Sequence, residues 1–231
     1  MSAMANEIKE FLEHVDTRCG KAERMTFQSG FNLSPDQFLD FAKEDLKTDL
    51  KHKFINSLSN AKKAVDCHID LMLQAFGYYE VSKKKRWGFP DKQAKMSQIG
   101  IAAPAILNKL NKLRNLMEHE FVNPSQDEVI DFVDVTDLFI RATESSIKGY
   151  CPYLEMENET TGLKMCFHLG SEKKEITLRT YDIAYDSYTD YKNSFAAPPA
   201  PPVKLKIWLL ADPEFDQVLT YFVASVKRIG Y

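Results

Sequence analysis

The chain has 231 residues, of which 44% are hydrophobic and 27% charged, and its formal net charge is −3. This length suits one large domain or two small ones, and the apolar content is sufficient for a buried core. The small negative charge excludes a protein that coats nucleic acid through bulk charge, so any nucleic-acid contact must be local.

The N-terminal segment and the cysteines favour a cytoplasmic protein. Residues 1–13 are charged from Glu7 onward and lack the apolar core of a secretory signal. No apolar run approaches the roughly 20 residues that a membrane-spanning helix requires, so we expect no membrane anchoring. The chain has no Cys-x-x-Cys pair, and we expect reduced thiols at Cys19, Cys67, Cys151 and Cys166.

Apolar residues recur at helical spacing through the first two thirds of the chain. Ser34-Pro35-Asp36-Gln37 predicts a helix start, since Ser34 can cap the helix and Gln37 can complete a capping box. One long helix or two should follow as far as Gly77, with any break near residues 56–60. Residues 78–98 lose this period and predict a loop.

Two more helices are predicted before residue 150. They span about residues 104–121 and 126–147, and Pro124 separates them because proline cannot continue a helix. The second should bury Val129, Val133, Thr136 and Ile140, or the neighbouring Phe132 and Phe139.

Beyond residue 150 the apolar spacing shifts from helical toward two. Strands are predicted around residues 163–167, 176–178 and 203–207, with a possible fourth at 153–156. Turn residues between them favour antiparallel hairpins. The Pro-rich stretch 196–202 predicts an extended connector, and a last helix should begin at Asp212-Pro213.

These patterns together predict a mainly α fold in three parts. Residues 1–33 form a helical extension, residues 34–150 a helical bundle, and residues 151–231 a small α/β part with an antiparallel sheet and a C-terminal helix. Neither metal nor cofactor is expected, because the five histidines show no ligand spacing and the nine glycines form no nucleotide fingerprint.

The residues that could carry chemistry are Arg114, Asn115 and His119. Asn115 and His119 share a helix face, and the Arg114 side chain can reach the same edge. An imidazole can shuttle protons and a guanidinium can grip a phosphate, so the three suit phosphodiester cleavage with the ribose 2′-hydroxyl as nucleophile. Spacing alone favours a plainer alternative, in which Arg114 pairs with Glu118 and His119 is a half-buried helix residue.

The segment Leu113-Arg114-Asn115-Leu116-Met117-Glu118-His119-Glu120-Phe121, with the helix start that follows it, resembles the signature of the HEPN family. The resemblance covers roughly residues 35–147. It implies a HEPN-like helical bundle that dimerises so that two motifs face one cleft and cleave single-stranded RNA without a metal. Arg114 would then stabilise phosphate charge, Asn115 would orient the site, and His119 would act as general acid or base.

The resemblance also implies a place among toxins or phage-defence effectors, with an antitoxin or a nucleotidyltransferase as a candidate partner. A homodimer is favoured independently, because one histidine cannot serve as acid and base at once. The alternative functions are a non-catalytic HEPN-like module that binds RNA, a nucleotide or a protein, and a purely structural dimer.

A second candidate RNA contact lies in the predicted loop. Cations and aromatic residues alternate there in the manner of single-stranded RNA sites, which combine phosphate attraction with base stacking. A solvated loop with rings tucked into the core is the alternative. The candidate contacts are Lys84, Lys85, Arg86 and Trp87.

Overall fold

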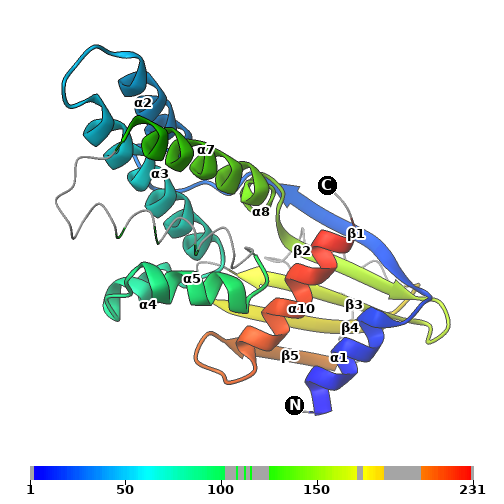
Figure 1. Ribbon diagram of the computed structural model, residues 1–231. Helices are drawn as coiled ribbons and strands as arrows, with labels where there is room; N and C mark the ends of the chain where they lie inside the picture. Colours follow the sequence, from blue (N-terminus) through cyan, green and yellow to red (C-terminus); the bar gives the residue numbers. More distant parts are fainter. Residues whose placement is uncertain are drawn as a thin grey trace. The chain divides into compact units, whose positions relative to one another are not determined.

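The computed structural model describes residues 3–101, 125–170, 174–184 and 204–229, together with Asn108, Lys112 and Asn115. The chain divides into two compact units (Figure 1). Phe27–Lys148 form the first, here called the helical unit. Met1–Thr26 and Gly149–Tyr231 form the second, here called the sheet unit.

The helical unit contains only helices in its described part. The first of them begins at the predicted capping box, where Gln37 N–H donates to Ser34 Oγ at 3.2 Å and Ser34 N–H donates to Gln37 Oε1 at 2.9 Å. The break after it lies at residues 48–52, earlier than predicted. The helices are α2 (Pro35–Lys47), α3 (Lys53–Ala75), α4 (Tyr79–Lys84), α5 (Phe89–Gln98), α7 (Gln126–Thr143) and α8 (Ser145–Lys148).

Helix α3 packs against both α2 and α7 and supplies much of the core of this unit. Polar groups tie α2 to α3, because the buried Ser57 Oγ donates to the Ala42 carbonyl at 2.7 Å. The six residues of α7 named above as core candidates are all buried. The periodicity of α7 therefore predicted its buried side.

Helices α4 and α5 correct the predicted loop at residues 78–98. The first has six residues and the second ten, which is too short for a helical period to stand out in the sequence. The signal for α5 was its start, where the Asp91 side chain accepts the Gly88 N–H at 3.0 Å and Pro90 occupies the first turn.

The sheet unit is a five-stranded antiparallel sheet with helices α1 (Ala3–Glu13) and α10 (Phe215–Arg228) side by side across one face (Figure 1). The rings of Phe167 and Phe222 lie 6.1 Å apart between sheet and helix. The strands follow chain order: β1 (Thr17–Met25), β2 (Tyr150–Asn158), β3 (Leu163–Gly170), β4 (Glu175–Asp182) and β5 (Lys204–Leu209).

The prediction of a mainly α fold is wrong, because a five-stranded antiparallel sheet with α1 and α10 forms the second of the two compact units. The missed strand is β1, which was assigned to a helical extension of the bundle. Its sequence, Thr-Arg-Cys-Gly-Lys-Ala-Glu-Arg-Met, is polar because β1 is an edge strand with few fully buried positions, so no apolar alternation marks it.

Two sequence predictions fall outside the described residues. The Pro-rich connector at 196–202 is one, and most of the helix at 104–121 is the other. Asn108, Lys112 and Asn115, the described residues of that stretch, are each helical and exposed. Among the described helices, none is both long and apolar enough to cross a bilayer.

His68 is buried in the helical unit, with 3% of its surface exposed. Its Nε2 lies 2.8 Å from Thr143 Oγ1, and that hydroxyl donates its own proton to the Phe139 carbonyl at 2.7 Å. Nε2 must therefore carry the proton, and Nδ1 is the nitrogen that titrates. Burial lowers the pKa of His68 from 6.5 to about 4.

We predict that acid destabilises the helical unit through His68. The unfolded chain binds a proton below pH 6.5 whereas the folded chain resists it down to about pH 4, so stability is complete above 6.5 and is lost as the pH falls toward 4. Between pH 7 and pH 5 the loss from this group should be about 2 kcal/mol. Urea unfolding followed by circular dichroism measures it. His68→Gln, which keeps the N–H donor, should remove that part of the pH dependence; an unchanged dependence contradicts the assignment.

Candidate functional site

The proposed catalytic motif is described at one of its three positions. Asn115 is helical and exposed, whereas Arg114 and His119 lie outside the described residues, as do all distances that involve them. One contact places this stretch within its unit: the Gln93 side-chain amide on α5 donates to Asn108 Oδ1 at 2.5 Å. Asn108, seven residues before Asn115, therefore touches α5.

The candidate RNA contacts gather where α4 ends and α5 begins. We call residues 83–86 the basic corner: Lys83, Lys84, Lys85 and Arg86, all exposed. Trp87, which follows, is half-buried. Lys83 lies 3.7 Å from Glu80, but Lys84, Lys85 and Arg86 pair with no carboxylate in the described part of the chain. Their charge is consequently open to solvent.

Hydrogen bonds fix the backbone of the basic corner. Arg86 N–H donates to the Lys83 carbonyl at 3.1 Å, and Trp87 N–H donates to the Ser82 carbonyl at 2.9 Å. This pair of bonds is a Schellman motif, which satisfies the last carbonyls of α4 and requires a left-handed residue at Arg86. The φ angle of Arg86 is 53°. The corner is thus a defined turn and not the irregular loop that the sequence predicted.

Most of the aromatic rings around the corner are buried or in contact with other side chains. Tyr78 and Phe89 are only 4% and 6% exposed. The Tyr79 ring contacts Phe31 with centroids 5.5 Å apart, and Lys83 Nζ lies 5.1 Å above it. Tyr78 and Phe89 match the alternative of rings tucked into the core, so the rings left for base stacking at the corner are those of Tyr79 and Trp87, both half-buried.

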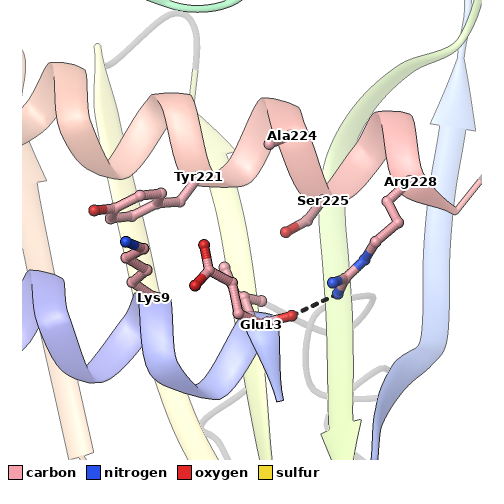
Figure 2. A pocket seen from close by; sticks show the side chains of 7 residues that line it. Lys9, Glu13, Tyr221, Ala224, Ser225 and Arg228 are labelled. Carbon is pink, nitrogen blue, oxygen red and sulfur yellow. Dashed lines mark hydrogen bonds between the residues drawn. The ribbon is translucent and has the colours of Figure 1, made fainter. Parts of the chain in front are cut away.

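The sheet unit has a hollow of about 200 Å³ between α1 and α10 (Figure 2). Arg228 reaches across it and donates to the Leu12 carbonyl at 2.6 Å, so it caps the C-terminal turn of α1. The hollow is smaller than the roughly 300–1,000 Å³ of most ligand pockets. We therefore interpret it as a seam between two packed helices. Its lining is Lys9, Leu12, Glu13, Tyr221, Ala224, Ser225 and Arg228.

A charged group lies buried on neighbouring strands of the sheet, and the sequence analysis missed it. Lys164 Nζ is 3.4 Å from both Glu155 Oε1 and Glu157 Oε1, and Tyr153 OH donates to Glu155 Oε2 at 2.9 Å. Glu155 and Lys164 are 1% and 5% exposed. A Cβ atom at Gly20 would lie 2.7 Å from the Glu157 carboxylate carbon, so a larger residue there would have to displace that carboxylate.

The described residues show neither a reactive thiol nor a metal site. Burial raises the pKa of Cys67 to about 11 and that of Cys151 to about 12, whereas a nucleophilic thiol needs a lowered pKa. No three His, Cys, Asp or Glu side chains of the described part come together as a metal site. Lys164 and its two carboxylates satisfy one another, which gives them a structural role.

Comparison of the chain with protein-family models, with curated proteins and with solved structures finds no match.

We predict that Lys164→Met destabilises the sheet unit by about 3–5 kcal/mol, because two carboxylates are left close together and one of them is buried. Trp208 is buried in this unit, and the chain has two tryptophans. In a Trp87→Phe background the fluorescence of Trp208 therefore reports urea unfolding of the sheet unit alone. Adding Glu155→Gln and Glu157→Gln should restore part of the loss. An effect of Lys164→Met within about 0.5 kcal/mol would show that the group contributes little.

Proposed function

We propose that the chain is a metal-independent endoribonuclease of HEPN type. The observation that carries the proposal is the run from Arg114 to His119, with the spacing of that family's motif. Two features of the described residues support it. Asn115 is helical and exposed, and Asn108 contacts α5, which follows directly after the basic corner and Trp87-Gly88.

In the proposed reaction the ribose 2′-hydroxyl attacks the adjacent phosphorus and expels the 5′-oxygen of the next nucleotide. His119 of one subunit removes the hydroxyl proton and His119 of the other protonates the leaving oxygen. Arg114 neutralises the charge that develops on the phosphate oxygens, and the Asn115 amide orients the phosphate. The products carry a 2′,3′-cyclic phosphate and a 5′-hydroxyl.

The second candidate function is RNA binding without cleavage. It is favoured by Lys84, Lys85 and Arg86 of the basic corner, which pair with no carboxylate in the described part of the chain, since exposed cations bind phosphates whether or not a catalytic site lies nearby. An inhibitory partner such as an antitoxin would fit either function.

We predict that the purified protein cleaves single-stranded RNA in excess EDTA and leaves 2′,3′-cyclic phosphate ends. His119→Ala removes the proton shuttle and Arg114→Ala the phosphate grip, so each should slow cleavage by about 100-fold or more. Gel analysis of end-labelled RNA measures both effects. Melts of the variants separate lost chemistry from lost fold. If both variants stay folded and keep full activity, the cleavage comes from another site or a contaminant. RNA binding without cleavage is then the better account of the chain.

We further predict a homodimer whose interface includes the residues around Arg114 to His119, because the reaction uses two proton-transfer groups. Light scattering at micromolar concentration should give twice the 26.5 kDa chain mass. Mixing the variants Arg114→Ala and His119→Ala should restore no activity, because the mixed dimer keeps a single His119 and the reaction uses two. A strict monomer, with or without RNA, contradicts the shared site.

A further inference from the structure

Three helices of the helical unit end in the same backbone motif. One of them has a different residue type at the left-handed position of that motif. Helices α3, α4 and α5 each close with a Schellman motif whose left-handed residue is Gly77, Arg86 and Gly100. Their φ angles are 83°, 53° and 74°. Glycine adopts this conformation without a steric penalty, while a residue with a Cβ atom does not. Arg86 therefore occupies a position at which glycine is the stabilising choice.

The departure coincides with a local excess of positive charge. The segment 79–98 holds six cations against two carboxylates, while the whole chain has a net charge of −3. Two of the six are engaged elsewhere in the unit: Lys92 Nζ pairs with Asp70 at 2.5 Å, and Lys95 lies over the Tyr78 ring. The other four are the basic corner. Like charges crowded on a strained turn destabilise the folded chain, which is typical of a binding surface.

We infer that the basic corner binds the phosphate backbone of single-stranded RNA through charge, without reading its bases. Lys84, Lys85 and Arg86 supply cations that pair with no carboxylate among the described residues, on a backbone fixed by two hydrogen bonds. Base recognition would need accessible rings or fixed polar edges, whereas Tyr78 and Phe89 are buried and Tyr79 and Trp87 are half-buried. The inference rests on the proposed RNA function and identifies the basic corner as the surface that binds the RNA substrate.

The chemistry of the corner favours the phosphate backbone of RNA over an anionic membrane as its ligand. Membrane-surface segments add apolar side chains that insert among the lipids. Among the described residues, none of the exposed large apolar side chains lies in α4, α5 or the corner between them. Only charge is presented there.

The test measures binding separately from cleavage. The probe is a 2′-O-methyl oligouridylate of about 20 nucleotides, which has no free 2′-hydroxyl and so cannot be cut by 2′-hydroxyl attack. Fluorescence anisotropy across a salt series gives its dissociation constant. The variant Lys84→Ser/Lys85→Ser/Arg86→Gly should weaken binding at least tenfold at low salt and reduce the slope of log K against log salt by about 2, because single strands contribute about 0.7 per phosphate contact. A matching oligoadenylate should bind within twofold of the uridylate.

The matched control is Lys47→Ser/Lys51→Ser/Lys63→Ser, which removes the same charge from exposed positions elsewhere in the helical unit. It should change binding by less than twofold. Equal weakening by the two variants would show bulk attraction and overturn the inference, as would binding to phosphatidylserine vesicles but not to the oligonucleotide. Weakened binding in a protein that never cleaves RNA would preserve this inference and remove the proposed ribonuclease activity.

The single substitution Arg86→Gly provides a second test, because it should raise stability while it weakens binding. It should raise the melting temperature by about 4 °C, since it relieves the left-handed strain and the crowding of charge, and it should weaken oligonucleotide binding about threefold. A lower melting temperature would show that Arg86 stabilises the fold, and that result would overturn the strain argument.

Discussion

The helical unit depends on one constraint: every helix end leaves backbone N–H and C=O groups that must find partners. Ser34 and Ser125 cap the starts of α2 and α7 through their hydroxyls, and Asp91 serves the same end at α5. The Schellman motifs close three helices within residues 73–101. These local bonds make short helices such as α4 possible and determine where the chain turns.

That constraint also positions the residues proposed to meet RNA. Four consecutive cations would repel one another in any compact conformation, yet the end of α4 holds them on one turn. The turn leads directly into α5, and α5 contacts Asn108, which precedes the proposed catalytic motif. Order in the backbone, rather than pairing of the charges, thus keeps the corner in place.

Whether a helix or strand could be predicted from the sequence depended on how many residues its pattern covers. The capping box at Ser34 and the long apolar stripes of α3 and α7 were visible because they repeat over many residues. Helices α4 and α5 were not, since their six and ten residues make fewer than three turns, too few for a period to emerge. Strand β1 was hidden by its polar composition, and the sheet therefore looked smaller than it is.

The site was predictable only as chemistry and not as geometry. The sequence shows which side chains could bind a phosphate, but it does not show that Tyr78 and Phe89 are buried or that Arg86 is left-handed. Those properties arise from tertiary packing and from the helix end. The buried group of Glu155, Glu157 and Lys164 was missed for the same reason, because its members meet only across paired strands.

The central claim is that one RNA strand engages both the basic corner and the motif around Asn115. An NMR titration of ¹⁵N-labelled protein with the 2′-O-methyl oligouridylate tests it directly. The account predicts that the amide resonances of Arg86, Trp87 and Asn115 shift together with one dissociation constant. Shifts confined to the corner would separate binding from the proposed catalytic site. Shifts confined to the sheet unit would contradict the account altogether.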